Sequence, residues 1–95
     1  MIRWTPEAAN DFKAIREYIA ADNLEAAFRQ CDLIADSIAQ LARFPLSGKP
    51  RLQGTIRQLA VPNTAYTIYY RQRPEAIVLL GILHGAMRVP RHLRK

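Results

Sequence analysis

The chain has 95 residues, of which 49% are hydrophobic, and a formal net charge of +6. This length suits one compact domain over residues 1–95 and leaves no room for a second, and the hydrophobic content excludes a disordered arm. The longest apolar run, residues 76–83, is far shorter than the roughly 20 residues that cross a bilayer. A single cysteine, Cys31, cannot form an internal disulfide. We therefore expect a cytoplasmic protein with no membrane contact.

The charges are unevenly placed along the chain. Residues 1–42 contain four Lys or Arg and seven Asp or Glu, whereas residues 43–95 contain ten Lys or Arg and a single acidic residue, Glu75. Eleven of the fourteen basic residues are arginine, which binds phosphate and carboxylate groups through paired hydrogen bonds. The C-terminal half therefore predicts a polyanionic partner, either a nucleic acid or an acidic protein segment; the alternative is a solvated basic surface.

Residues 2–4 predict a short extended segment, and a helix is expected to follow it. Thr5 fits the N-cap, and Pro6 fits the first helical position because the N–H that proline lacks has no partner there. A helix over residues 6–21 is predicted by apolar side chains at helical spacing. These are Ala8, Phe12, Ile15 and Ile19.

A second helix is predicted over residues 24–43, capped by Asn23 or Asp22. Its apolar residues recur at alternating spacings of four and three, which predicts antiparallel packing on the first helix. These residues are Ala27, Cys31, Ile34, Ile38 and Leu41. Cys31 lies within this set, and we interpret it as a small core residue rather than a nucleophile.

Residues 44–54 are rich in proline and glycine and predict a loop. After them the apolar period falls to two, and residues 55–61, 66–71 and 76–83 predict an antiparallel meander. The predicted fold class is α+β with the order β-α-α-β-β-β, in which a helical hairpin packs on one face of a curved antiparallel sheet. The other face of the sheet is expected to carry Arg57, Arg71 or their neighbours.

His84 and Gly85 follow the last predicted strand and suggest an imidazole at the rim of the sheet beside a turn. A metal-independent ribonuclease needs an acid, a base and cations for the phosphate, which Arg57, Arg71, His84 and Arg88 could supply. Alternatively, His84 bonds the backbone and the arginines bind the carboxylates of a partner. The residues by themselves leave both interpretations open.

Metal chemistry is not expected, because Cys31, His84 and His92 lack the spacing of metal ligands. Neither a phosphate-binding glycine loop nor a Ser/His/Asp triad is present in the sequence. We therefore expect no cofactor and no metal site.

Five segments, in this order and spacing, resemble the RelE/ParE superfamily of bacterial type II toxins, and specifically its ParE-like branch. They are IRWTPEAANDFKAIREYIAADNLEAA, LARFPLSGKP, GTIRQLAV, YTIYYR and ILHGAMRVP. The resemblance implies a cytoplasmic toxin that arrests growth and is neutralised by a ParD-like antitoxin in a hetero-oligomeric complex. The antitoxin is expected to lay an acidic segment along the helices and the sheet.

Two targets are implied by the two branches of this superfamily. ParE-like members block DNA gyrase, whereas RelE-like members cut mRNA in the ribosome. Thr67 stands where the nuclease branch would place an arginine, and no tyrosine follows His84 as a terminal acid or base. These departures favour a gyrase inhibitor that acts by binding, with the ribosome-dependent endoribonuclease as the alternative and a non-toxic nucleic-acid-binding module as a more distant one.

The resemblance and the charge pattern together predict which residues contact the target or the antitoxin, and no catalytic residue is among them. They are Arg57, Arg71, Arg73, His84, Arg88 and Arg91.

Overall fold

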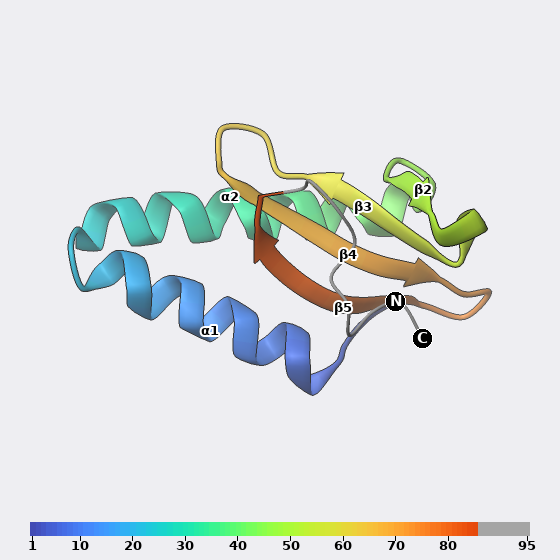
Figure 1. The fold of residues 1–95 in the computed structure, drawn as a ribbon, viewed down its shortest axis with the longest axis horizontal. Coiled ribbons are helices and arrows are strands. Elements are labelled where there is room, and N and C mark those ends of the chain that lie inside the picture. The colour runs from blue at the N-terminus through green and yellow to red at the C-terminus, as the bar shows by residue number, and fades with distance from the viewer. Residues whose placement is uncertain (86–95) are drawn as a thin grey trace.

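The computed structural model describes residues 1–85, so the predicted contacts at Arg88 and Arg91, and His92, lie outside the described residues. Figure 1 shows two helices lying against one twisted sheet. In chain order the elements are β1 (Ile2–Trp4), α1 (Pro6–Ala20), α2 (Leu24–Arg43), β2 (Lys49–Arg51), a 3₁₀ turn η1 (Leu52–Gly54), β3 (Ile56–Ala60), β4 (Tyr66–Gln72) and β5 (Ile77–His84).

Both predicted helices are confirmed, and each begins at a side-chain cap. The Thr5 hydroxyl accepts a hydrogen bond from the Ala8 N–H at 3.1 Å, and the side-chain Oδ1 of Asn23 accepts one from the Ala26 N–H at 3.0 Å. These bonds satisfy backbone donors that the first turn of a helix leaves free. The cap of α2 is therefore Asn23 rather than Asp22, and α1 ends at Ala20, one residue earlier than predicted.

The sheet has the strand order β1-β5-β4-β3-β2, and the predicted antiparallel meander of β3, β4 and β5 is confirmed. Two features differ from the sequence-based expectation. First, β1 pairs in parallel with β5, so the sheet is mixed rather than wholly antiparallel. Second, the predicted loop over residues 44–54 contains β2 and η1. The sequence pattern hides β2 because a three-residue edge strand with a proline at its centre has no readable alternation.

The main hydrophobic core lies between the helical hairpin and one face of the sheet. Of the predicted apolar positions of α1, Ala8 and Ile15 are buried, and Phe12 and Ile19 pack against the core. In α2, four of the five predicted positions are buried and Cys31 is half-buried. Burial raises the pKa of the Cys31 thiol, although Arg16 opposes this, so the nucleophilic thiolate is disfavoured.

The opposite face of the sheet carries a second, smaller hydrophobic cluster. Ile56 and Tyr69 are buried there, and Leu80 and Leu83 pack against them. Arg71 is two residues from Tyr69 along β4 and shares this face, as predicted for it. Arg57, the other residue named for this face, is paired with Tyr70, a member of the main core, so it lies on the helical side instead. The alternation of apolar residues could not predict which face Arg57 lies on, because both faces of β3 carry apolar residues.

Within residues 1–85, no helix is both long enough and apolar enough to span a bilayer.

Candidate binding surfaces at the two ends of β4

The larger hollow lies between α1 and the end of the sheet where β4 begins and β5 ends. Its volume is about 900 Å³. We call it the apolar groove, since most of its lining is hydrophobic: Ala14, Ile15, Tyr18 and Ile19 from α1, with Tyr66 and Ile82 from the sheet. Tyr18 is 79% exposed, so a large aromatic side chain stands open to solvent in the groove.

Asp11 brings a carboxylate to the edge of the apolar groove. Strand β1 pairs only with residues 77–79 of β5, so within residues 1–85 the outer edge of β5 beyond Leu79 has no neighbouring strand. There the Asp11 Oδ2 accepts a hydrogen bond from the Ile82 N–H at 3.0 Å. A Cβ on Gly81 would lie 3.2 Å from the same oxygen, so the glycine permits the close approach. Helix α1 thus supplies a side-chain acceptor to this edge of β5.

His84 closes the same end of the sheet. Its ring meets the Tyr66 ring edge-on, with 5.5 Å between centroids, and the side chain is exposed. Gly85 follows with φ of 80°, which confirms the predicted glycine turn. Burial raises the pKa of the Tyr66 hydroxyl and keeps it neutral. His84 is therefore a rim residue of the apolar groove.

The second hollow lies at the opposite end of β4, beside the loop that follows α2 and the start of β3. Its volume is about 350 Å³. We call it the basic cleft, and its lining includes Leu46, Thr55, Arg57, Arg71, Gln72 and Arg73. Arg57 Nη1 donates to the carbonyls of Leu46, at 3.2 Å, and Gly48, at 2.7 Å. Arg71 Nη1 donates to the Thr55 carbonyl at 2.9 Å. Backbone oxygens thus hold two guanidinium groups in place.

Tyr70 fixes the wall of the basic cleft from inside the core. Its fully buried hydroxyl accepts a hydrogen bond from the Gly48 N–H at 2.9 Å and donates one to the Pro45 carbonyl at 2.8 Å. A Cβ on Gly48 would lie 2.6 Å from this oxygen, so a larger residue would displace the loop. Burial raises the pKa of Tyr70, with the Gly48 bond and then Arg57 acting against it.

Of the three described members of the predicted nuclease set, Arg57 and Arg71 line the basic cleft, whereas His84 lies at the other end of β4. Arg71 pairs with Val78 and His84 pairs with Tyr66, so the two lie five residues apart along β4, or roughly 17 Å at the rise of a strand. Arg57 lies on the other face from Arg71. Within residues 1–85, moreover, no group of three His, Cys, Asp or Glu side chains could hold a metal ion.

Sequence reasoning missed the residues that line the apolar groove. The groove combines one side of α1 with the ends of two strands, and only tertiary structure joins them. One signal was present: Tyr18 is a large aromatic residue outside the helically spaced apolar set of residues 6–21. Asp11 carried no such signal, since an acidic residue on an exposed helical face is ordinary.

The architecture has a solved counterpart. It is similar to the structure described as the chromosomal ParDE TA system from P. aeruginosa, with a TM-score of 0.78 and 22% sequence identity over 90% of this chain and 95% of that chain. At this identity the likeness shows the fold: an α+β domain with a helical hairpin on a mostly antiparallel sheet.

Sequence comparison identifies the family. The family model described as "ParE toxin of type II toxin-antitoxin system, parDE" matches residues 2–89. A curated protein of Sinorhizobium fredii, named "Putative toxin Y4kP", is 32% identical over 92 residues, which are 97% of this chain and 95% of that protein. The chain therefore belongs to the ParE toxin family of type II toxin–antitoxin systems, and the resemblance seen in its motifs is confirmed.

Proposed function

We propose that this ParE-family toxin arrests growth in the cytoplasm by binding DNA gyrase, and that a cognate antitoxin holds it inactive. The family assignment supports the toxin role, and the motif pattern favours the gyrase branch. The observation that carries binding over mRNA cleavage is the separation of Arg71 from His84 by most of the length of β4. General acid–base catalysis needs its groups within hydrogen-bonding reach of one phosphate, and these two are too far apart.

The antitoxin is proposed to be of the ParD type and to insert apolar side chains into the apolar groove, forming a hetero-oligomeric complex. The groove has the features of a site for an amphipathic segment: an apolar floor, an exposed aromatic side chain at Tyr18 and polar groups at the rim in Asp11 and His84. The formal charge of +6 would attract an antitoxin segment rich in acidic residues.

The proposal is tested with purified toxin freed from its antitoxin. The toxin is added to a gyrase supercoiling reaction and, separately, to translating ribosomes. We expect loss of supercoiling with intact mRNA, and recovery of supercoiling when the antitoxin is added back. Cleavage of mRNA at defined codon positions, with supercoiling unaffected, would show instead that the toxin is a ribosome-dependent nuclease.

A further inference from the structure

The basic cleft lies at the opposite end of β4 from the apolar groove and shares no lining residue with it. We propose that it binds the phosphate backbone of a nucleic acid, with Arg71 and Arg73 as the principal contacts. This inference goes beyond the proposed function, because it holds for bare nucleic acid whether or not gyrase is the target.

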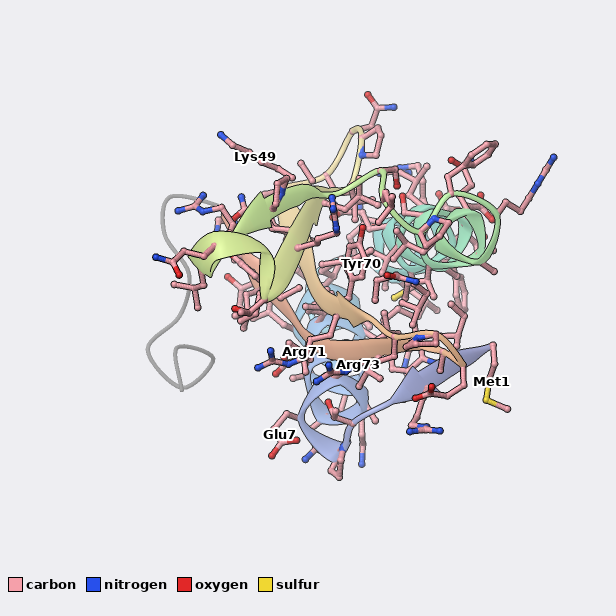
Figure 2. All side chains as sticks on the ribbon, turned by 90° about the vertical axis from the view of Figure 1, so that its right-hand side faces the viewer. Met1, Glu7, Lys49, Tyr70, Arg71 and Arg73 are labelled. Carbon is pink, nitrogen blue, oxygen red and sulfur yellow. The ribbon has the colours of Figure 1, made fainter. Side chains whose placement is uncertain are left out.

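The geometry places two guanidinium groups at the mouth of the cleft. Arg71 is half-buried and held by the Thr55 carbonyl, and Arg73 is exposed just beyond the end of β4. Figure 2 looks onto this end of the molecule and shows Arg71 and Arg73 together, below Tyr70. Lys49 lies higher in the view, on the edge strand β2. A guanidinium has five N–H donors, so the single carbonyl bond of Arg71 leaves others for a phosphate oxygen.

Within residues 1–85, the segment that forms the cleft is mainly basic. Residues 44–76 contain five basic side chains and one acidic one, Glu75, which lies in the turn between β4 and β5. Among residues 1–85, no carboxylate pairs with Arg71 or Arg73. Arg51 on β2 bonds the side-chain oxygen of Gln58 at 3.1 Å rather than a carboxylate. An external anion would therefore find these cations uncompensated.

The lining of the cleft favours nucleic acid over an acidic protein segment. The centre of a protein interface is depleted of charge and enriched in aromatic anchors, as the apolar groove is at Tyr18. The basic cleft has no aromatic side chain in its lining; Leu46 is exposed there, but most of the lining side chains are polar, namely Thr55, Arg57, Arg71, Gln72 and Arg73. Interfaces with nucleic acids are polar and strongly positive in this way. Since phosphate contacts carry no sequence information, binding is expected to be independent of sequence.

The test is the affinity of the purified full-length toxin for a fluorescent DNA duplex of about 20 base pairs, measured by anisotropy between about 50 and 200 mM salt. The double variant Arg71→Gln/Arg73→Gln is expected to bind about tenfold or more weakly at low salt. The slope of log affinity against log salt should fall by about 2, since each lost phosphate contact removes about 0.9. Because Arg71 also bonds Thr55, the single variant Arg73→Gln is measured as well. The Arg73 side chain has no hydrogen bond to another of residues 1–85, and the slope of its variant should fall by about 1.

The matched control is Arg3→Gln/Arg29→Gln, which removes the same charge from exposed positions on β1 and α2. It should change the affinity less than twofold, because charges at a distance are screened. If the control and the cleft variants lose DNA affinity equally, the loss comes from the lower net charge alone, and the proposal is overturned. Unchanged DNA binding in the cleft variants, with weakened binding of the antitoxin, would also overturn it and assign the cleft to the antitoxin.

Discussion

The two ends of β4 present unlike surfaces. At the Tyr66 end, α1 and the sheet enclose the apolar groove, whose lining is mainly hydrophobic. At the Arg71 end, the loop after α2 and the start of β3 enclose the basic cleft, which is less than half as large and lined mainly by polar side chains. One strand thus separates a surface suited to a peptide from a surface suited to a phosphate.

The difference follows from how each end of the sheet is closed. At the groove, the edge of β5 is capped by one carboxylate from α1, which leaves apolar side chains uncovered beside it. At the cleft, guanidinium and phenol groups bond loop carbonyls, so the wall is rigid and polar. The character of each surface therefore depends on which side chains form hydrogen bonds with the backbone at that end of the sheet.

The largest expected effect is on antitoxin binding at the groove. Replacing Tyr18 by Ala should weaken the complex about 30-fold or more, or about 2 kcal/mol, because an exposed aromatic anchor in a groove is a typical hot spot. Isothermal titration calorimetry measures the dissociation constant. The matched control is Phe28→Ala on α2, a residue that is 60% exposed and does not line the groove. Equal losses in the two variants would place the antitoxin along the helices in general rather than in the groove.

At the other end, Tyr70→Phe should destabilise the fold by about 1–2 kcal/mol. The change leaves the Gly48 N–H and the Pro45 carbonyl without their buried partner. Urea unfolding followed by circular dichroism gives the free energy. Affinity for the antitoxin should stay unchanged in the folded variant, whereas DNA binding should weaken as the wall of the cleft loosens. A fall in antitoxin affinity alone would contradict the separation of the two surfaces.

A smaller effect is expected at the edge of β5. Asp11→Ala should lower the free energy of unfolding by about 1 kcal/mol, because the Ile82 N–H loses its acceptor. Asp11→Asn retains an acceptor oxygen and should restore most of the loss, as urea unfolding would show. If both variants are equally unstable, the charge of Asp11 matters rather than its hydrogen bond.

The smallest effect is common to both ends and appears at high pH. Burial raises the pKa of Tyr66, Tyr69 and Tyr70 above the usual value of about 10. Their contribution to stability is fully present below about pH 10 and is lost as the pH rises through the higher pKa values of the folded state. Urea unfolding at about pH 8 and about pH 11 should therefore show a lower free energy at the higher pH. An unchanged free energy would mean that these hydroxyls titrate as exposed ones do.

Local signals in the sequence predicted most of the fold. Thr5 and Asn23 mark where the helices begin, and apolar periods of 3.6 and then 2 give the helices and the meander. The parallel pairing of β1 with β5 was not predictable, because it joins segments at opposite ends of the described chain. Nor was β2, whose three residues have too little pattern to identify a strand.

The candidate site was less predictable than the fold. Composition drew attention to Arg71 and Arg73, and the structure places both in one cleft. The faces of β3 were ambiguous, since Ile56 on one face and Leu59 on the other are both apolar. The sequence therefore left open which of Arg57 and Arg71 lies away from the helices, and the structure places Arg71 there. The apolar groove could not be foreseen, because its lining is assembled from α1 and two strand ends.

The most direct test of the two-surface account is to measure both affinities, for the antitoxin and for the DNA duplex, in both Tyr18→Ala and Arg73→Gln. The account predicts that Tyr18→Ala loses antitoxin affinity and keeps DNA affinity, and that Arg73→Gln does the reverse. A single variant that loses both affinities while remaining folded would contradict it, since one surface would then serve both partners.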